Sequence, residues 1–188
     1  MPTILVGAAS RPGGRAPNSS LVSPNSTREL FMELGKNSFT GETKPCQTAI
    51  ESHRAGADVI TGDTAGRKKS IELLEELGFP KGLLPTEDIQ EFGYNGETGF
   101  TWLVQGKKKV EHTFKKIMQT VSYASEVTAL FAEKSKLRKI TGVKTKELML
   151  WFSVVEVYVP EASPDKVTFK TGTGLSDTFD ATAFAFGQ

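Results

Sequence analysis

Apolar and polar residues alternate with a period of two through most of the chain after residue 100. Val110, His112 and Phe114 share one face of such a segment, and the alternation continues through residues 121–131. A period of two predicts strands with one buried face. Turn residues divide these segments at short intervals, so we expect six or seven antiparallel strands between residues 100 and 186.

One predicted strand, residues 148–159, is apolar on both of its faces. Strands of that kind are covered on both sides. We therefore expect this strand at the centre of the sheet, with Trp151 and Trp102 packed in one core.

Helical spacing replaces the alternation earlier in the chain. Ile71, Leu74 and Leu77 recur at intervals of three residues. Asp63 precedes them as a carboxylate suited to capping a helix, and Gly78 follows them as a stop. This pattern predicts the strongest helix of the chain.

Two shorter helices are predicted at residues 47–57 and 86–89. Together with the strands that follow, they place the protein in the α+β class, mainly β. We expect an antiparallel barrel-like or strongly curved sheet entered by an N-terminal helix.

The first 45 residues differ in composition from the rest. Residues 1–28 contain no acidic residue and are rich in Ser, Pro, Asn and Gly. Such a segment buries too little apolar surface to offset an ordering entropy of ~1–2 kcal/mol per residue. We expect a disordered leader or a transit segment at 1–45 and a single helix-plus-β-barrel-like domain at 46–188. A plain extension or mis-set start, organelle targeting and secretion all remain open.

The overall composition excludes several classes of protein. The 188 residues are 38% hydrophobic, and no apolar run approaches the ~20 residues that a spanning helix needs. The single cysteine cannot form an internal disulfide, and two histidines are too few for a Cys/His zinc site. We expect no metal and no cofactor. The expected location is cytoplasmic or peripheral to a membrane, or a plastid if residues 1–45 are a transit peptide.

Charge is unevenly distributed along the chain. Residues 72–97 contain seven acids and one lysine, whereas residues 107–146 contain eleven basic residues and three acids. Near an anionic bilayer each basic residue adds ~1 kcal/mol of attraction. The candidates for headgroup binding, selected by strand parity, are Lys107, Lys109, Lys115, Lys136 and Arg138. The alternative is that these residues only keep edge strands soluble. Nucleic acid is not an expected partner, because exposed aromatic residues do not alternate with the lysines.

Candidate catalytic residues are few. The chain has no Gly-x-Ser-x-Gly elbow, and His112 is the only histidine within the predicted sheet. It is therefore the only candidate base for a serine triad there, and the fold would have to bring a serine and an aspartate to it. The alternative is a packed histidine, since His112 shares its strand face with Val110 and Phe114.

Six short motifs follow one another along the chain. They are Gly82-Leu83-Leu84-Pro85, Phe92-Gly93-Tyr94, Thr98-Gly99-Phe100-Thr101-Trp102-Leu103, Val121-Ser122-Tyr123, Thr141-Gly142-Val143-Lys144 and Thr171-Gly172-Thr173-Gly174-Leu175-Ser176. Together they resemble a plant family catalogued as domain of unknown function 538, over residues 60–186. The resemblance implies a compact, helix-entered, barrel-like fold and supplies no established reaction. Members are likened to lipid-binding bactericidal/permeability-increasing proteins and credited with chlorophyll-related esterase activity.

Two functions follow as hypotheses. The first is a binding module, in which the interior or a groove between helix and sheet takes an apolar or amphipathic small molecule. In this hypothesis the basic stretch contacts the headgroups of an anionic membrane surface. The second is an ester hydrolase that acts on a chlorophyll or lipid ester through His112.

Overall fold

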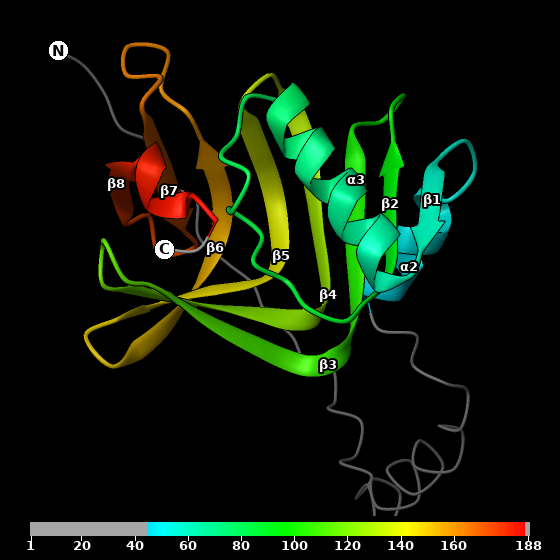
Figure 1. The fold of residues 1–188 in the computed structure, drawn as a ribbon, viewed down its shortest axis with the longest axis horizontal. Coiled ribbons are helices and arrows are strands. Elements are labelled where there is room, and N and C mark those ends of the chain that lie inside the picture. Colours follow the sequence, from blue (N-terminus) through cyan, green and yellow to red (C-terminus); the bar gives the residue numbers. More distant parts are fainter. Residues whose placement is uncertain (1–44, 187–188) are drawn as a thin grey trace, which may run out of the picture. The chain divides into compact units, whose positions relative to one another are not determined.

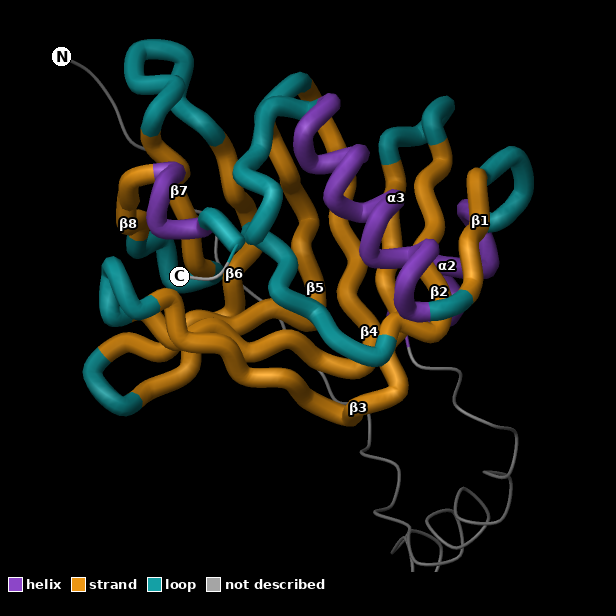
Figure 2. Tube along the Cα trace, viewed as in Figure 1, coloured by secondary structure: helices purple, strands orange, loops and turns teal. Residues whose placement is uncertain are grey.

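In residues 45–186, which a computed structural model describes, eight antiparallel strands form one sheet (Figures 1 and 2). The strands are β1 (Asp58–Thr61), β2 (Ile89–Asn95), β3 (Phe100–Phe114), β4 (Gln119–Glu133), β5 (Lys136–Glu147), β6 (Leu150–Tyr158), β7 (Lys166–Thr171) and β8 (Ser176–Asp180). They stand in the sheet in the order in which they occur along the chain. The prediction of a leader at 1–45 lies outside the described residues, apart from its last position.

The mainly β, antiparallel fold predicted from the alternation is confirmed, but the sheet is not a closed barrel. The edge strands β1 and β8 pair only with β2 and β7, respectively, in the described residues. Closure into a barrel requires the two edge strands to pair with each other. Both are short, with four and five residues, and the sheet remains open between them.

The strands in the middle of the sheet bend. The pairing register shifts between Val104 and Lys109 on β3, and corresponding shifts interrupt the β4–β5 and β5–β6 pairings. Unpaired residues of this kind bend a strand and increase its twist. Figure 1 shows the result, because β3 and β4 run along the lower edge of the view and then turn upward. The bend gives β3–β6 two parts that enclose the core between them.

Gly142 makes the bend of β5 sterically feasible. Its φ is 79°, in the left-handed region, and a Cβ at this position would lie 2.2 Å from the carbonyl oxygen of Glu126 on β4. Only glycine adopts this conformation at so close an approach of two backbones. The strand β5 therefore continues through Gly142 to Glu147.

Two α-helices and one 3-10 helix accompany the sheet. They are α2 (Pro45–His53), α3 (Asp63–Glu76) and η1 (Ala181–Phe184). The helix predicted before Gly78 is confirmed as α3, but Asp63 is its first residue and not its cap, because Gly62 holds the N-cap position and no side chain makes a capping hydrogen bond. The helix buries Leu73 and Leu74 in the main core together with Leu103 of β3. Neighbouring Trp102 points to the opposite face, because side chains alternate along a strand. There it packs with Ile50 of α2.

Three expectations about single segments are wrong. Trp102 is buried, but Trp151 is only half-buried and belongs to neither buried cluster. Leu148 and Met149 form an exposed turn before β6, so residues 148–159 do not make a strand covered on both faces. Residues 86–89 are not helical, and Ile89 begins β2.

Candidate functional site

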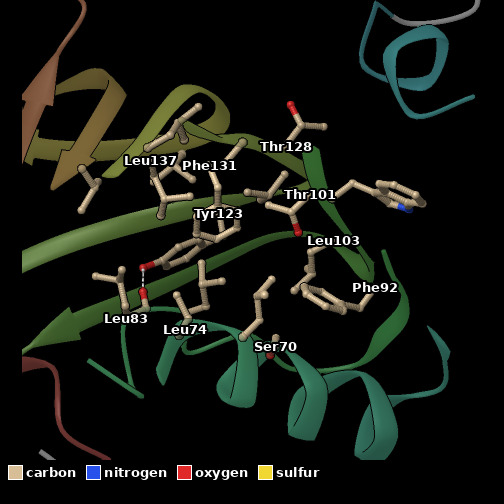
Figure 3. Close-up of a pocket in the computed structure, with 18 of the residues that line it drawn as sticks. Ser70, Leu74, Leu83, Phe92, Thr101, Leu103, Tyr123, Thr128, Phe131 and Leu137 are labelled. Atoms are coloured by element: carbon tan, nitrogen blue, oxygen red, sulfur yellow. Dashed lines mark hydrogen bonds between the residues drawn. The ribbon is translucent and has the colours of Figure 1, made fainter. Parts of the chain in front are cut away.

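A cavity lies between α3 and the sheet (Figure 3). Its walls are almost entirely apolar and include Leu74 of α3, Phe92 of β2 and Leu137 of β5. Its volume is about 60 Å³, far below the ~300–1,000 Å³ of pockets that bury drug-sized ligands. The cavity as it stands therefore has room for a small apolar group and not for a lipid tail.

The polar groups on the cavity wall are already engaged. The Tyr123 hydroxyl donates a hydrogen bond of 3.0 Å to the carbonyl oxygen of Leu83, as the dashed line in Figure 3 marks. Burial raises the pKa of Tyr123 far above its ordinary value, so this hydroxyl stays protonated. The Ser70 hydroxyl donates to the carbonyl oxygen of Arg67 at 2.8 Å. Neither hydroxyl is left free to bind or activate a substrate.

His112 sits in an apolar environment on β3. Its ring contacts Phe114 edge-on, with 4.7 Å between ring centroids, and its cross-strand neighbour is Val121. Burial lowers the pKa of its imidazole. Within residues 45–186 it forms no hydrogen bond to a serine or a carboxylate, so the structure brings together no triad around it. The same residues contain no group of three His, Cys, Asp or Glu side chains that could hold a metal ion.

Lysines gather in the part of the sheet beyond the bend. We call this part, residues 106–125 and 142–153, the lysine lobe, because it contains seven lysines against two glutamates, all of the lysines exposed. Three of the five residues selected from the sequence lie here, namely Lys107, Lys109 and Lys115. Lys107 is paired with Glu87 at 2.7 Å and Lys109 with Glu111, so these two charges are partly neutralised.

The other two selected residues lie elsewhere. Lys109 stands opposite Ala124 of β4, whereas Lys136 stands opposite Glu133. Nine positions along one strand correspond to ~30 Å, even before the bend is considered. The five residues therefore do not line one rim.

Lys136 and Arg138 instead surround one carboxylate. Both contact Glu156 of β6, at 3.7 and 3.5 Å, and Lys170 of β7 approaches the same side chain at 4.0 Å. Strand parity correctly placed Lys136 and Arg138 on one face. Strand parity carried no information about the position of these two residues along the sheet, because that position depends on the register and the bend.

Trp151 and two lysines form the centre of the lysine lobe's surface. The Nζ atoms of Lys109 and Lys146 lie 4.9 and 5.8 Å from the centroid of the half-buried Trp151 ring, within the range of cation–π contacts. Sequence reasoning missed this role of Trp151, because the apolar run around it indicated a buried strand. The alternation of Lys144 and Lys146 was the available signal, since it marks an exposed face of β5.

Gln119 joins the two hairpins of the lysine lobe. Its side-chain amide donates to the carbonyl oxygen of Lys146 at 3.0 Å and to the carboxylate of Glu147 at 2.8 Å. It also bonds the hydroxyl of Thr145. Because Gln119 begins β4 and these partners end β5, the β3–β4 and β5–β6 turns are held side by side.

Comparisons with known proteins add a family. Residues 70–185, more than half of the chain, match the family described as "Protein of unknown function, DUF538". No curated protein and no solved structure matches the chain. Among residues 45–186 neither helix has the length and hydrophobicity needed to cross a bilayer.

Proposed function

Since the chain belongs to the DUF538 family, whose description states no activity, we propose from the lysine lobe that it binds reversibly to anionic membrane surfaces. The observation that carries the proposal is the composition of that lobe, with seven exposed lysines against two glutamates on adjacent strands. This charge lies at one end of a molecule whose formal net charge is only +1. The protein would therefore be attracted to an anionic surface in a defined orientation.

The strength of the attraction follows from the lysines that have no acidic partner. Lys107 and Lys109 are paired, which leaves five lysines of the lobe without an ion pair to a described carboxylate, namely Lys108, Lys115, Lys116, Lys144 and Lys146. At ~1 kcal/mol for each basic residue near the surface, these five supply ~5 kcal/mol. That is sufficient for reversible binding and insufficient for permanent anchoring.

Trp151 supports a lipid surface over a soluble anion. A tryptophan at a bilayer surface places its apolar ring at the headgroup level, and its N–H remains hydrated. Trp151 is half-buried and lies between Lys109 and Lys146. A tryptophan flanked by lysines matches the interfacial region of an anionic bilayer.

The other hypotheses receive less support from the geometry. The interior cavity of about 60 Å³ is too small for an amphipathic lipid without rearrangement. His112 packs against Phe114 and lacks the partners of a triad among the described residues. Ligand binding in the interior and ester hydrolysis are therefore less favoured than surface binding.

The test is sedimentation with vesicles of phosphatidylcholine alone or mixed with phosphatidylserine. We expect binding to the mixed vesicles only. The double variant Lys144→Glu, Lys146→Glu should bind ~30-fold more weakly, because two attractions of ~1 kcal/mol are lost. Its matched control is Lys134→Glu, Lys139→Glu, which makes the same charge change near the opposite end of β5 and should bind like the wild type.

Two outcomes would reject the proposal. One is the absence of binding to phosphatidylserine vesicles by the wild type at low salt. The other is an equal loss of binding in the two double variants, which would show that net charge matters and the lysine lobe does not.

A further inference from the structure

The large apolar side chains that remain exposed are concentrated at one end of the sheet. Among residues 45–186 six of them are more than half exposed. Of these six, only Phe186 lies away from the hairpin turns. The other five are Met118 (81%), Leu148 (96%), Met149 (82%), Leu150 (62%) and Leu175 (54%). They belong to the β3–β4, β5–β6 and β7–β8 turns or lie directly beside them. We call residues 115–118, 148–150 and 172–175 the apolar turns.

The connectivity puts these three turns at the same end. In an antiparallel sheet whose strands follow sequence order, alternate turns lie at the same edge. The Gln119 side chain ties the first turn to the second through Lys146 and Glu147. The third lies beside β6, where the backbone N–H of Gly172 donates a hydrogen bond of 2.9 Å to the carbonyl oxygen of Ser153. In Figure 1 the β3–β4 and β5–β6 turns both project at the left of the view, the β5–β6 turn below the β3–β4 turn.

The turns at the opposite end have a different composition. Residues 96–99, 134–135 and 159–165 contain Gly, Glu, Thr, Lys, Ser, Pro and Asp, with one alanine and the half-buried Val159, and no exposed large apolar side chain is described there. Both ends consist of hairpin connections between neighbouring strands. The difference between them therefore reflects a requirement other than forming hairpins.

The backbone conformation of the apolar turns is also unfavourable. Met118, Leu148 and Met149 have φ values of 55°, 46° and 74°, a left-handed conformation that is unfavourable for bulky L-residues. Two consecutive positive φ values mark a type I′ hairpin turn, for which Asn-Gly is strongly preferred. Leu148 and Met149 are thus unfavourable for two reasons. Their backbone is left-handed, and their apolar side chains are exposed to water. Such costs are retained where an interaction partner offsets them.

Charge identifies the partner. Lys115 and Lys116 lie in the first apolar turn, and Lys144 and Lys146 lie just before the second. The turns therefore carry apolar side chains at their tips and lysines behind them. This arrangement matches the order of layers in an anionic bilayer, with acyl chains inside and phosphates outside. An acidic protein would form ion pairs with the lysines, but it would leave the apolar side chains of the turns exposed to water.

We propose that the apolar turns insert into the acyl region of the anionic membrane that the lysine lobe binds, so that this end of the sheet points into the bilayer. The inference rests on the proposed function and adds the depth and direction of binding. Leu148 and Met149 enter deepest, because they are the two most exposed large apolar side chains of the three turns. Lys144 and Lys146 then lie at the level of the headgroups.

The key variant is Leu148→Asn, Met149→Gly. It removes the apolar tips and installs the residues that the turn conformation favours. We expect its thermal midpoint to rise by a few degrees and its binding to phosphatidylserine-containing vesicles to weaken at least ~10-fold, since ~0.8 kcal/mol is lost for each CH₂ withdrawn from the acyl region. Phe186→Ser removes an exposed apolar residue outside the turns and should leave binding unchanged.

Depth is measured separately with a fluorophore. The single cysteine is first replaced, Cys46→Ser, and an environment-sensitive dye is attached through Met149→Cys or, as the control, Lys134→Cys in the opposite turns. With phosphatidylserine vesicles the dye at position 149 should shift to shorter wavelength and be quenched by lipids brominated on their acyl chains. The dye at position 134 should show neither effect.

The outcomes separate this inference from the proposed function. If the labelled protein sediments with anionic vesicles but the dye at position 149 neither shifts nor is quenched, insertion is rejected and surface binding stands. Unchanged binding by the Leu148→Asn, Met149→Gly variant has the same meaning. If the wild type does not sediment at all, both proposals are rejected.

Discussion

Glu91 is the residue at which a helix, two strands and a tryptophan meet. Its carboxylate accepts hydrogen bonds from Arg54, which follows α2, at 2.9 and 3.2 Å, and from the indole N–H of Trp102 at 2.7 Å. Burial opposes its ionisation, but these donors outweigh burial and lower the pKa of Glu91 below its ordinary value. The ionised form therefore stabilises the fold.

The sign of the pH dependence follows from the lowered pKa. A carboxylate of this kind contributes stability above its unfolded pKa of ~4.3, and the contribution is lost as the pH falls through the folded value. We expect the Glu91→Gln variant to have a lower thermal midpoint than the wild type at pH 7. The difference should shrink as the pH falls below ~4. A difference that is constant with pH would show that the charge of Glu91 is not involved.

The two tryptophans should respond differently to truncation. Trp102 is almost fully buried, and its ring covers Gly93 so closely that a Cβ there would lie 2.1 Å from it. Trp102→Ala should therefore cost ~3–5 kcal/mol of unfolding free energy in urea titrations. Trp151→Ala should cost far less, since its ring already contacts water, and equal losses would contradict this assignment. From the sequence both residues were expected in one core, because alternation identifies strands without identifying where the core ends along them.

At the scale of elements, the bend of β5 depends on Gly142. Gly142→Ala should destabilise the fold by more than the ~1–2 kcal/mol that a left-handed L-residue costs, because its Cβ also meets the backbone of Glu126. Gly174 is the matched control, since its φ is 90° but nothing lies within 4 Å of its Cβ position. Gly174→Ala should cost only the conformational penalty. Equal free energies of unfolding for the two variants would show that the close approach at Gly142 does not matter.

The elements that were predicted from the sequence follow local patterns, whereas those that were missed depend on tertiary contacts. The helix α3 and the strand β4 are long and strongly periodic, and they were predicted. β1 and β2 are short, and β2 contains Gly93, whose lack of a side chain makes room for Trp102. Residues 86–89 look like a capped helix, but the Asp63 carboxylate accepts the backbone N–H of Ile89 and holds it extended at the start of β2. Tertiary contacts of this kind are invisible to local patterns.

For the whole molecule, the uneven charge was visible in the sequence, but its arrangement in space was not. The basic stretch 107–146 passes twice through the bend, so the fold divides it between the lysine lobe and the cluster around Glu156. The apolar turns were missed altogether. Their residues alternate or cluster as in buried strands, and only the turn positions distinguish the exposed Leu148 and Met149 from the half-buried Trp151.

Salt should separate the two contributions to membrane binding. The Debye length falls from ~10 Å at 0.1 M salt to ~3 Å at 1 M. High salt therefore removes the attraction between exposed lysines and the membrane and leaves apolar contacts in place. Vesicles loaded with wild-type protein should therefore retain part of it in high salt. The Leu148→Asn, Met149→Gly variant should be released completely. Complete release of both proteins would show that apolar contacts add nothing.

The order of strands in the sheet also bears on how the chain reaches its fold. From β2 to β7 every strand pairs with the strand that follows it along the chain. Each pairing then closes a short loop at small entropic cost, and sheets with such local contacts fold faster than sheets whose strands cross over. A chain leaving the ribosome can add one strand at a time, and from β2 onward no strand waits for a distant partner. The last of these strands, β8, then completes the sheet at an edge.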